Sequence, residues 1–147
     1  EDMLDTFRTR MQQAVKERVE ADPDLLVEKL LIEKELSAGE KNIGFAESLK
    51  LLEPYGEANP VPVFCMLNAA VSGVRTMGAE EQHVRFNATA ADGIPVNCVL
   101  FGRAAEYKDM IFGGKRVDVA GELDINEYRG ERKLQIRVKD IRASERK

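Results

Sequence analysis

The sequence has few of the residues that build structural metal sites or disulfide frameworks, since its 147 residues include only two Cys and one His. No apolar stretch approaches the ~20 residues that a membrane-spanning helix needs, so we expect no membrane partner and a cytoplasmic location. A signal peptide is also missing, because Glu1 and Asp2 open the chain where a basic and then an apolar segment would stand. Because the chain does not begin with Met, we expect it to be a piece of a longer protein.

The two cysteines, Cys65 and Cys98, each lie in an apolar, strand-like run without a second ligand at zinc-site spacing. Two reduced cysteines in the core are the main interpretation, and a disulfide between them is the alternative. The acidic residues are scattered without ligand-like spacing. We therefore expect no metal ion, no other cofactor and no catalytic residue in this chain.

Charge is divided unevenly along the chain, whose net charge is −4. Residues 1–60 hold 8 Lys and Arg against 14 Asp and Glu, whereas residues 61–147 hold 14 against 12. The last part, residues 115–147, holds 10 against 7. A basic end on an acidic chain is compatible with phosphate contact, and also with an ordinary solvated surface.

The first part of the chain is predicted to form a helix, a strand and a second helix. Apolar residues recur every three or four positions from Met3 to Val19, which predicts a helix, and Asp22-Pro23-Asp24 ends it because Pro interrupts the hydrogen-bond ladder. The run from Leu30 to Leu36 is predicted to be an extended strand, and Ile43 to Leu52 a helix.

A Pro-rich segment, Asn59-Pro60-Val61-Pro62, prevents helix formation, and we place a boundary there between domains 1–61 and 62–147. Beyond it the apolar residues alternate, which predicts strands. The predicted strands are Val63–Met77 with a bend at Gly73, His83–Thr89, Ile94–Phe101, and two more around Val117–Ile125 and Leu134–Val138. The fold class is α+β: a five-stranded antiparallel OB-fold β-barrel after a helix-strand-helix segment.

In a small closed barrel, alternate side chains fill the interior and the others face outward. Cations, amides and planar groups on the outside are suited to phosphates, base edges and base stacking, and OB-folds bind oligonucleotides on such a face. We expect a nucleic-acid site made of these outward residues: His83, Arg85 and Asn87 on the second strand, Gln135, Arg137 and Lys139 on the last, and Tyr128 and Arg129 at a hairpin tip.

Four of these residues have a simpler alternative role. Arg137 and Lys139 suit any solvated strand, and they could pair across the hairpin with the acidic residues Asp118, Glu122 and Asp124. Tyr128 could cover the end of the barrel, and His83 could bond to a neighbouring loop.

The segment from Leu52 to Phe64 reads Leu-Glu-Pro-Tyr-Gly-Glu-Ala-Asn-Pro-Val-Pro-Val-Phe. It resembles the segment that joins the DHH-associated domain to the OB domain in the RecJ nucleases, with Ala58 at a position that is usually Gly. Further segments resemble the family in the same order: His83–Phe86, Phe101-Gly102, Ile125–Gly130, Leu134–Ile136 and Asp140–Arg142.

The resemblance implies 5′-to-3′ degradation of single-stranded DNA in recombination and repair, with Mn²⁺ or Mg²⁺ held in a DHH domain. With one His, no Asp-His-His run and no GGGH motif, the chain lacks that domain's motifs. We therefore expect an inactive, single-strand-binding piece of a RecJ-like exonuclease. Its expected partners are single-stranded DNA, the rest of the RecJ chain and, as a further partner, single-strand-binding protein. The alternatives are a structural or protein-docking OB module and an independent enzyme.

Overall fold

The structure is a computed structural model that describes residues 2–27 and 29–145. Contacts divide the chain into two compact units, residues 1–31 and residues 32–147. The predicted boundary between residues 61 and 62 stays a prediction. In the part that the structure describes, no helix is long and apolar enough to span a membrane.

The first unit consists of the predicted helix α1 (Asp2–Ala21) and a short 3-10 helix η1 (Pro23–Leu26). The predicted break is confirmed, because α1 ends one residue before Asp22, whose Oδ1 accepts a hydrogen bond from the Asp24 N–H over 3.1 Å. Five apolar side chains of α1 are between 49% and 87% exposed: Met3, Leu4, Phe7, Met11 and Val15. This unit therefore has no core of its own in the described residues.

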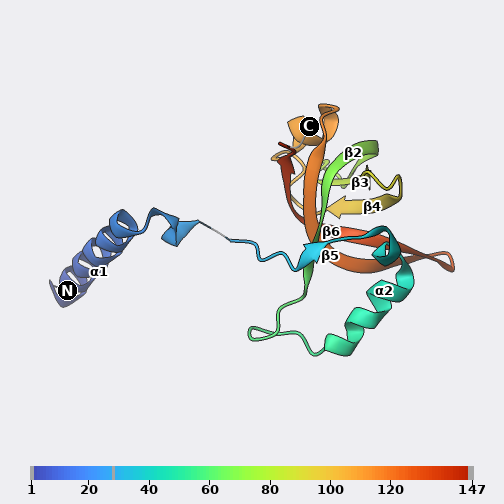
Figure 1. Cartoon of the computed structure of the whole chain (residues 1–147). Helices are drawn as coiled ribbons and strands as arrows, with labels where there is room; N and C mark the ends of the chain where they lie inside the picture. The colour runs from blue at the N-terminus through green and yellow to red at the C-terminus, as the bar shows by residue number, and fades with distance from the viewer. Residues whose placement is uncertain (1, 28, 146–147) are drawn as a thin grey trace. The chain divides into compact units, whose positions relative to one another are not determined.

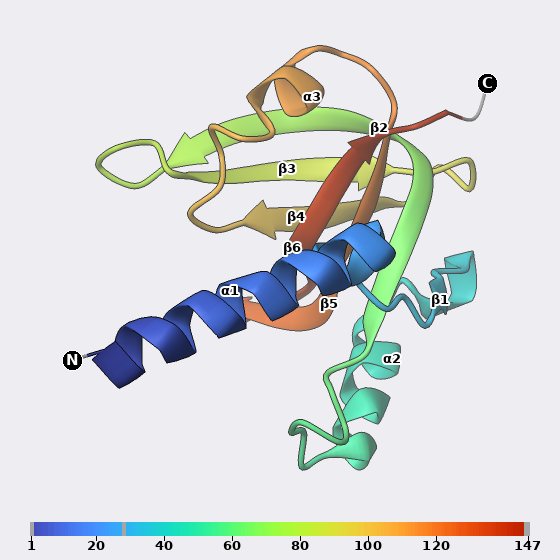
Figure 2. The same cartoon turned by 90° about the vertical axis from the view of Figure 1, so that its left-hand side faces the viewer.

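In its described residues, 32–145, the second unit contains six strands and four short helices. Figures 1 and 2 show how the strands are arranged. The strands are β1 (Lys34–Glu35), β2 (Val63–Met77), β3 (His83–Thr89), β4 (Pro95–Leu100), β5 (Val117–Tyr128) and β6 (Glu131–Ala143). The helices are η2 (Ala38–Glu40), α2 (Ile43–Ser48), η3 (Leu49–Leu52) and α3 (Lys108–Phe112), the last lying next to β2 and β6 (Figure 2).

The sheet closes into a ring. Its order is β1-β2-β3-β4-β6-β5, and an additional pairing between β5 and β2 completes a circle of five strands, with β1 attached to the edge of β2. Within the ring, one pairing differs from the antiparallel arrangement that we expected, because β4 and β6 run parallel, with Asn97 opposite Gln135 and Val99 opposite Arg137. Five is an odd number, so a closed ring whose neighbours alternate in direction must contain one parallel pair.

The predicted strand from Leu30 to Leu36 is shorter than expected, because only Lys34 and Glu35 form β1. The start of β2 offers backbone partners only to residues 33–36. The Glu33 N–H donates to the Val63 carbonyl, and the Leu36 N–H donates to the Cys65 carbonyl. The preceding residues 30–32 have no strand partner in the part of the chain that the structure describes.

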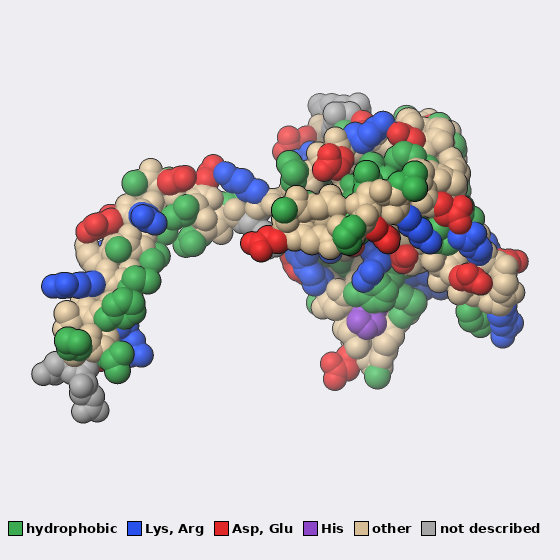
Figure 3. Space-filling view, turned by 90° about the horizontal axis from the view of Figure 1, so that it is seen from below, with side chains coloured by type: hydrophobic (Ala, Val, Ile, Leu, Met, Phe, Trp, Pro, Cys, Tyr) green, Lys and Arg blue, Asp and Glu red, His purple; other side chains and the backbone are tan. Residues whose placement is uncertain are grey.

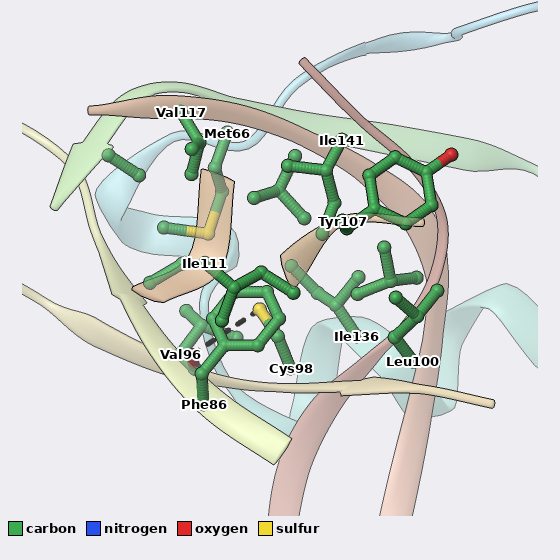
Figure 4. Close-up of a cluster of buried hydrophobic side chains, with 14 of the residues drawn as sticks. Met66, Phe86, Val96, Cys98, Leu100, Tyr107, Ile111, Val117, Ile136 and Ile141 are labelled. Carbon is green, nitrogen blue, oxygen red and sulfur yellow. Dashed lines mark hydrogen bonds between the residues drawn. The ribbon is translucent and has the colours of Figure 1, made fainter. Parts of the chain in front are cut away.

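The interior of the ring is a continuous apolar core (Figure 4). Its most deeply buried side chains include Met66, Val84, Phe86, Cys98, Leu100, Val117, Val119 and Ile136. The core placement of both cysteines is confirmed: Cys98 lies here and Cys65 in a smaller cluster with Val63 and Ala120. Burial raises the pKa of the Cys98 thiol to about 12.

Two turns shape the strands that carry the outer face. The bend in β2 is confirmed at Gly73, which has a φ of +61° and lies where the register with β3 shifts between Ser72 and Arg75. The hairpin between β5 and β6 turns at Arg129 and Gly130, with φ values of +52° and +79°. Two consecutive positive φ values are the requirement of a type I′ turn, which suits the twist of paired strands.

Candidate nucleic-acid interface

The outward face of β3, β4 and β6 collects most of the predicted site residues. Burial alternates along β3, so that Val84, Phe86 and Ala88 enter the core while His83, Arg85 and Asn87 face outward. The register with β4 places Asn97 opposite Asn87, and the next pairing places Gln135 opposite Asn97. The structure therefore brings the residues predicted on the second and the last strand onto one surface.

Side-chain hydrogen bonds connect the polar residues at the centre of this surface. The Arg85 Nε donates to the Asn97 Oδ1 over 3.1 Å, and the Asn97 Nδ2 donates to the Asn87 Oδ1 over 3.3 Å. Arg75 of β2 lies directly opposite Arg85, and it has no acidic partner in the part of the chain that the structure describes. Like charges in opposed positions repel each other, so an anion placed between these two guanidinium groups would be stabilised.

A groove of about 990 Å³ opens beside this pair. Its described lining includes five Lys or Arg residues and no Asp or Glu. The lining residues come from the start of α2 and the two residues before it (Lys41, Asn42, Ile43, Gly44), from β2, β3 and β4 (Gly73, Arg75, Arg85, Asn87, Pro95, Val96, Asn97) and from β6 (Arg132, Lys133, Leu134).

Two ion pairs hold the α2 wall of the groove. The Lys41 Nζ lies 2.5 Å from the Asp92 Oδ2 in the turn between β3 and β4, and the Lys41 side chain has no exposed surface. The Arg132 guanidinium lies 2.6 Å from the Glu47 Oε1 of α2. Hydrogen bonds to these cations lower the pKa of the Asp92 and Glu47 carboxyls. The fifth cation of the lining, Lys133, lies 2.8 Å from the Glu131 Oε2, so Arg75 and Arg85 are the cations of the described lining that have no acidic partner.

A second cluster lies at the other end of β3, around Phe101. The His83 ring meets the Phe101 ring edge to face, with 5.4 Å between centroids, and the Arg137 guanidinium carbon lies 6.0 Å from the Phe101 centroid. The His83 Nδ1 accepts a hydrogen bond from the Gly102 N–H over 2.8 Å, so the predicted bond from His83 to a neighbouring loop is present. Figure 3 shows this single histidine, in purple, beside apolar and basic side chains.

The pairing across the last hairpin is only partly the one considered from the sequence. The Lys139 Nζ lies 2.8 Å from the Glu122 Oε1, and the Gln135 Nε2 donates to the Asp124 Oδ2 over 2.7 Å. Arg137 faces Phe101 instead. Asp118 is the remaining acidic residue of that prediction. Its carboxylate accepts hydrogen bonds from the Arg142 Nε and from the Asn68 N–H. Lys139 and Gln135 are therefore engaged by neighbours, whereas Arg137 is not held by a carboxylate in the described part.

Tyr128 and Arg129 lie apart from both clusters, at the tip of the β5–β6 hairpin. The Arg129 guanidinium carbon lies 5.2 Å from the Tyr128 ring centroid, and neither residue lines the groove. Tyr128 is largely exposed, so it does not cover the end of the ring as the alternative interpretation would require.

Sequence reasoning missed three residues of this surface: Arg75, Asn97 and Phe101. Asn97 lies between the buried Val96 and Cys98, so alternation along the strand places its side chain outside. Continuing the same alternation to Phe101 would have placed that side chain outside as well. Arg75 follows the bend at Gly73, where a simple period of two loses its phase. No pattern in the sequence indicates that Arg75 faces Arg85.

The described residues contain no group of three or more His, Cys, Asp or Glu side chains that could hold a metal ion. The donor set required by Mn²⁺ or Mg²⁺, several converging oxygen or imidazole ligands, is thus not assembled by residues 2–27 and 29–145. The residues present do not fit such a centre.

Residues 32–140 match the family model of the RecJ OB domain. The chain belongs to this family. The chain is 33% identical over 97 residues to the single-stranded-DNA-specific exonuclease RecJ of Bacillus subtilis, covering 66% of this chain and 12% of that protein. The RecJ of Escherichia coli K12 is 31% identical over 144 residues, covering 96% of this chain and 24% of that protein.

A solved relative shows the same fold. The crystal structure of RecJ in complex with Mn²⁺ from Thermus thermophilus superposes with a TM-score of 0.61 and 28% identity, over 91% of this chain and 19% of that one. The resemblance seen in the sequence is therefore confirmed, and so is the OB-fold. The chain spans about a quarter or less of the length of these relatives.

Proposed function

We propose that this chain is the single-strand-binding part of a RecJ-type 5′-to-3′ exonuclease that acts on single-stranded DNA in recombination and repair. The observation that carries the proposal is the groove beside Arg75 and Arg85, whose described lining is cationic although the whole chain has a net charge of −4. Grooves that track a nucleic-acid backbone combine positive charge with planar groups for the bases. The names of the curated relatives, all single-stranded-DNA-specific exonucleases, support the choice of ligand.

Within this proposal the residues have distinct roles. Arg75 and Arg85 contact phosphates, because two opposed guanidinium groups attract an anion that bridges them. Asn87 and Asn97 offer amide groups to base edges, at the cost of their mutual hydrogen bond. Lys41 and Arg132 act indirectly, since their ion pairs fix the position of the α2 wall.

Phosphodiester hydrolysis belongs, in this proposal, to another domain of the full-length protein. The RecJ of Thermus thermophilus was crystallised in complex with Mn²⁺, which supports a metal-dependent nuclease centre in that protein. The contribution of the present chain is to hold the single strand.

Fluorescence anisotropy with labelled oligo-dT tests the proposal. We expect binding that weakens as salt rises, because cation–phosphate contacts release counterions. Replacing both Arg75 and Arg85 with Gln should make the negative slope of log K against log[salt] shallower by roughly 1.4. Each cation–phosphate contact to a single strand contributes about 0.7 to the magnitude of that slope. Lys115→Gln removes an exposed cation outside the groove lining and serves as the control.

Two results would count against the proposal. One is the absence of salt-sensitive binding at high micromolar protein. The other is binding of the tail peptide of single-strand-binding protein without any binding of the oligonucleotide, which would favour the protein-docking alternative.

A further inference from the structure

Phe101 is an exposed aromatic residue that lies beside the His83 ring and the Arg137 guanidinium. The residue follows β4 directly, where Cys98 and Leu100 are buried in the core. The alternation turns Phe101 outward, and 52% of the residue is exposed. An apolar ring kept at a surface beside cations is a common arrangement of sites that bind planar, negatively charged ligands.

We propose that Phe101 is a stacking site for one unpaired nucleobase, with His83 and Arg137 as its flanking residues. This inference rests on the proposed function and assigns one contact within it. The Arg137 guanidinium lies at the outer limit of cation–π contact, 6.0 Å from the ring centroid, so a base can take its place over the ring while Arg137 turns to a phosphate.

The histidine completes the site through a fixed orientation. Because the His83 Nδ1 accepts the Gly102 N–H, hydrogen bonding assigns the proton of the neutral ring to Nε2. That Nε2–H is then available to donate to a phosphate oxygen or a base carbonyl. The edge-to-face contact holds the His83 and Phe101 rings together.

The stacking site and the groove lie on one continuous face. His83 and Arg85 both point outward on β3, two residues and therefore roughly 7 Å apart along the strand. Arg137 lies opposite Val99 of β4, which in turn lies opposite Arg85. One polynucleotide can therefore place a phosphate at Arg85 and a neighbouring base on Phe101. A paired base in a duplex is already stacked on both sides, so this contact favours single strands.

The chain contains no Trp, which allows a direct optical test. In Phe101→Trp the single indole reports on its own environment, and we expect oligo-dT to quench its emission on binding. An abasic oligonucleotide of the same length carries the same phosphates without bases, and it should leave the emission unchanged.

Affinity gives the second readout. The wild-type chain should bind oligo-dT about tenfold more tightly than the abasic strand, within the range for one stacked base. In Phe101→Leu, which keeps an apolar side chain, this preference should disappear while the salt dependence remains. Phe112→Leu is the matched control, because Phe112 is also 52% exposed but lies on α3.

The outcomes separate the two proposals. Salt-sensitive binding with equal affinities for oligo-dT and the abasic strand, or with Phe101→Leu equal to the wild type, would overturn the stacking site and leave the groove standing. Failure of the wild-type chain to bind either strand would overturn both.

Discussion

Residues 1–31 and residues 32–147 use their apolar side chains in opposite ways. In the second unit the alternating pattern of the strands buries Phe86, Met66 and their neighbours in a closed ring. In the first unit the apolar stripe of α1 has the correct helical spacing, yet Phe7 and Met11 remain more than half exposed. A correct periodicity therefore predicts an element, whereas stability depends on whether a second element covers the apolar face.

The largest expected effect contrasts the two units directly. Phe86→Ala removes a ring that is 1% exposed and leaves a cavity, so the free energy of unfolding should fall by about 3–5 kcal/mol. Phe7→Ala changes a residue that is 63% exposed and should shift it by no more than about 0.5 kcal/mol. Urea denaturation followed by circular dichroism measures both, and comparable losses would contradict the contrast.

A smaller effect is expected where α2 is attached to the ring. Asp92→Asn leaves the ammonium of Lys41 buried without a charged partner, which should lower the free energy of unfolding by about 2 kcal/mol. Lys41→Met should cost less, because Asp92 is partly exposed and can be solvated. Thermal unfolding of the two variants checks the order, and a larger loss for Lys41→Met would show that the lysine's burial is not the cause.

The smallest expected effect is the loss of fold stability at low pH. Hydrogen bonds from Lys34 and then Ser37 lower the pKa of Glu40 to about 2, and the bond from Arg132 lowers that of Glu47. A depressed pKa in the folded state stabilises the fold above the unfolded value and loses this contribution as pH falls through the folded value. Stability should therefore decline between about pH 4.5 and pH 2. Glu40→Gln should flatten part of that decline in acid titrations; an unchanged pH profile would contradict this assignment.

Much of the fold could be predicted because its signals are local. The strands from Val63 to Thr89 follow from alternation and the bend at Gly73, and the last hairpin from its turn residues. The parallel pairing of β4 and β6 follows from ring closure, which no local pattern encodes. The strand predicted from Leu30 was too long because its length depends on the partner available in β2.

The candidate site was predicted in part for the same reason. His83, Arg85 and Asn87 could be placed outward from the period of their own strand. The groove could not be predicted, because its wall depends on Lys41 meeting Asp92, 51 residues further along the chain. Tyr128 and Arg129 have suitable chemistry for a site, but their position at the hairpin tip separates them from the groove lining.

The central claim is that the outer face of β3, β4 and β6 holds an unpaired strand. A titration of the ¹⁵N-labelled chain with oligo-dT, followed through amide chemical shifts, tests it most directly. We expect the largest shifts at the backbone amides of Arg75, Arg85, Asn97 and Phe101, and little change along α1. Shifts confined to α1, or no shifts at all, would contradict it.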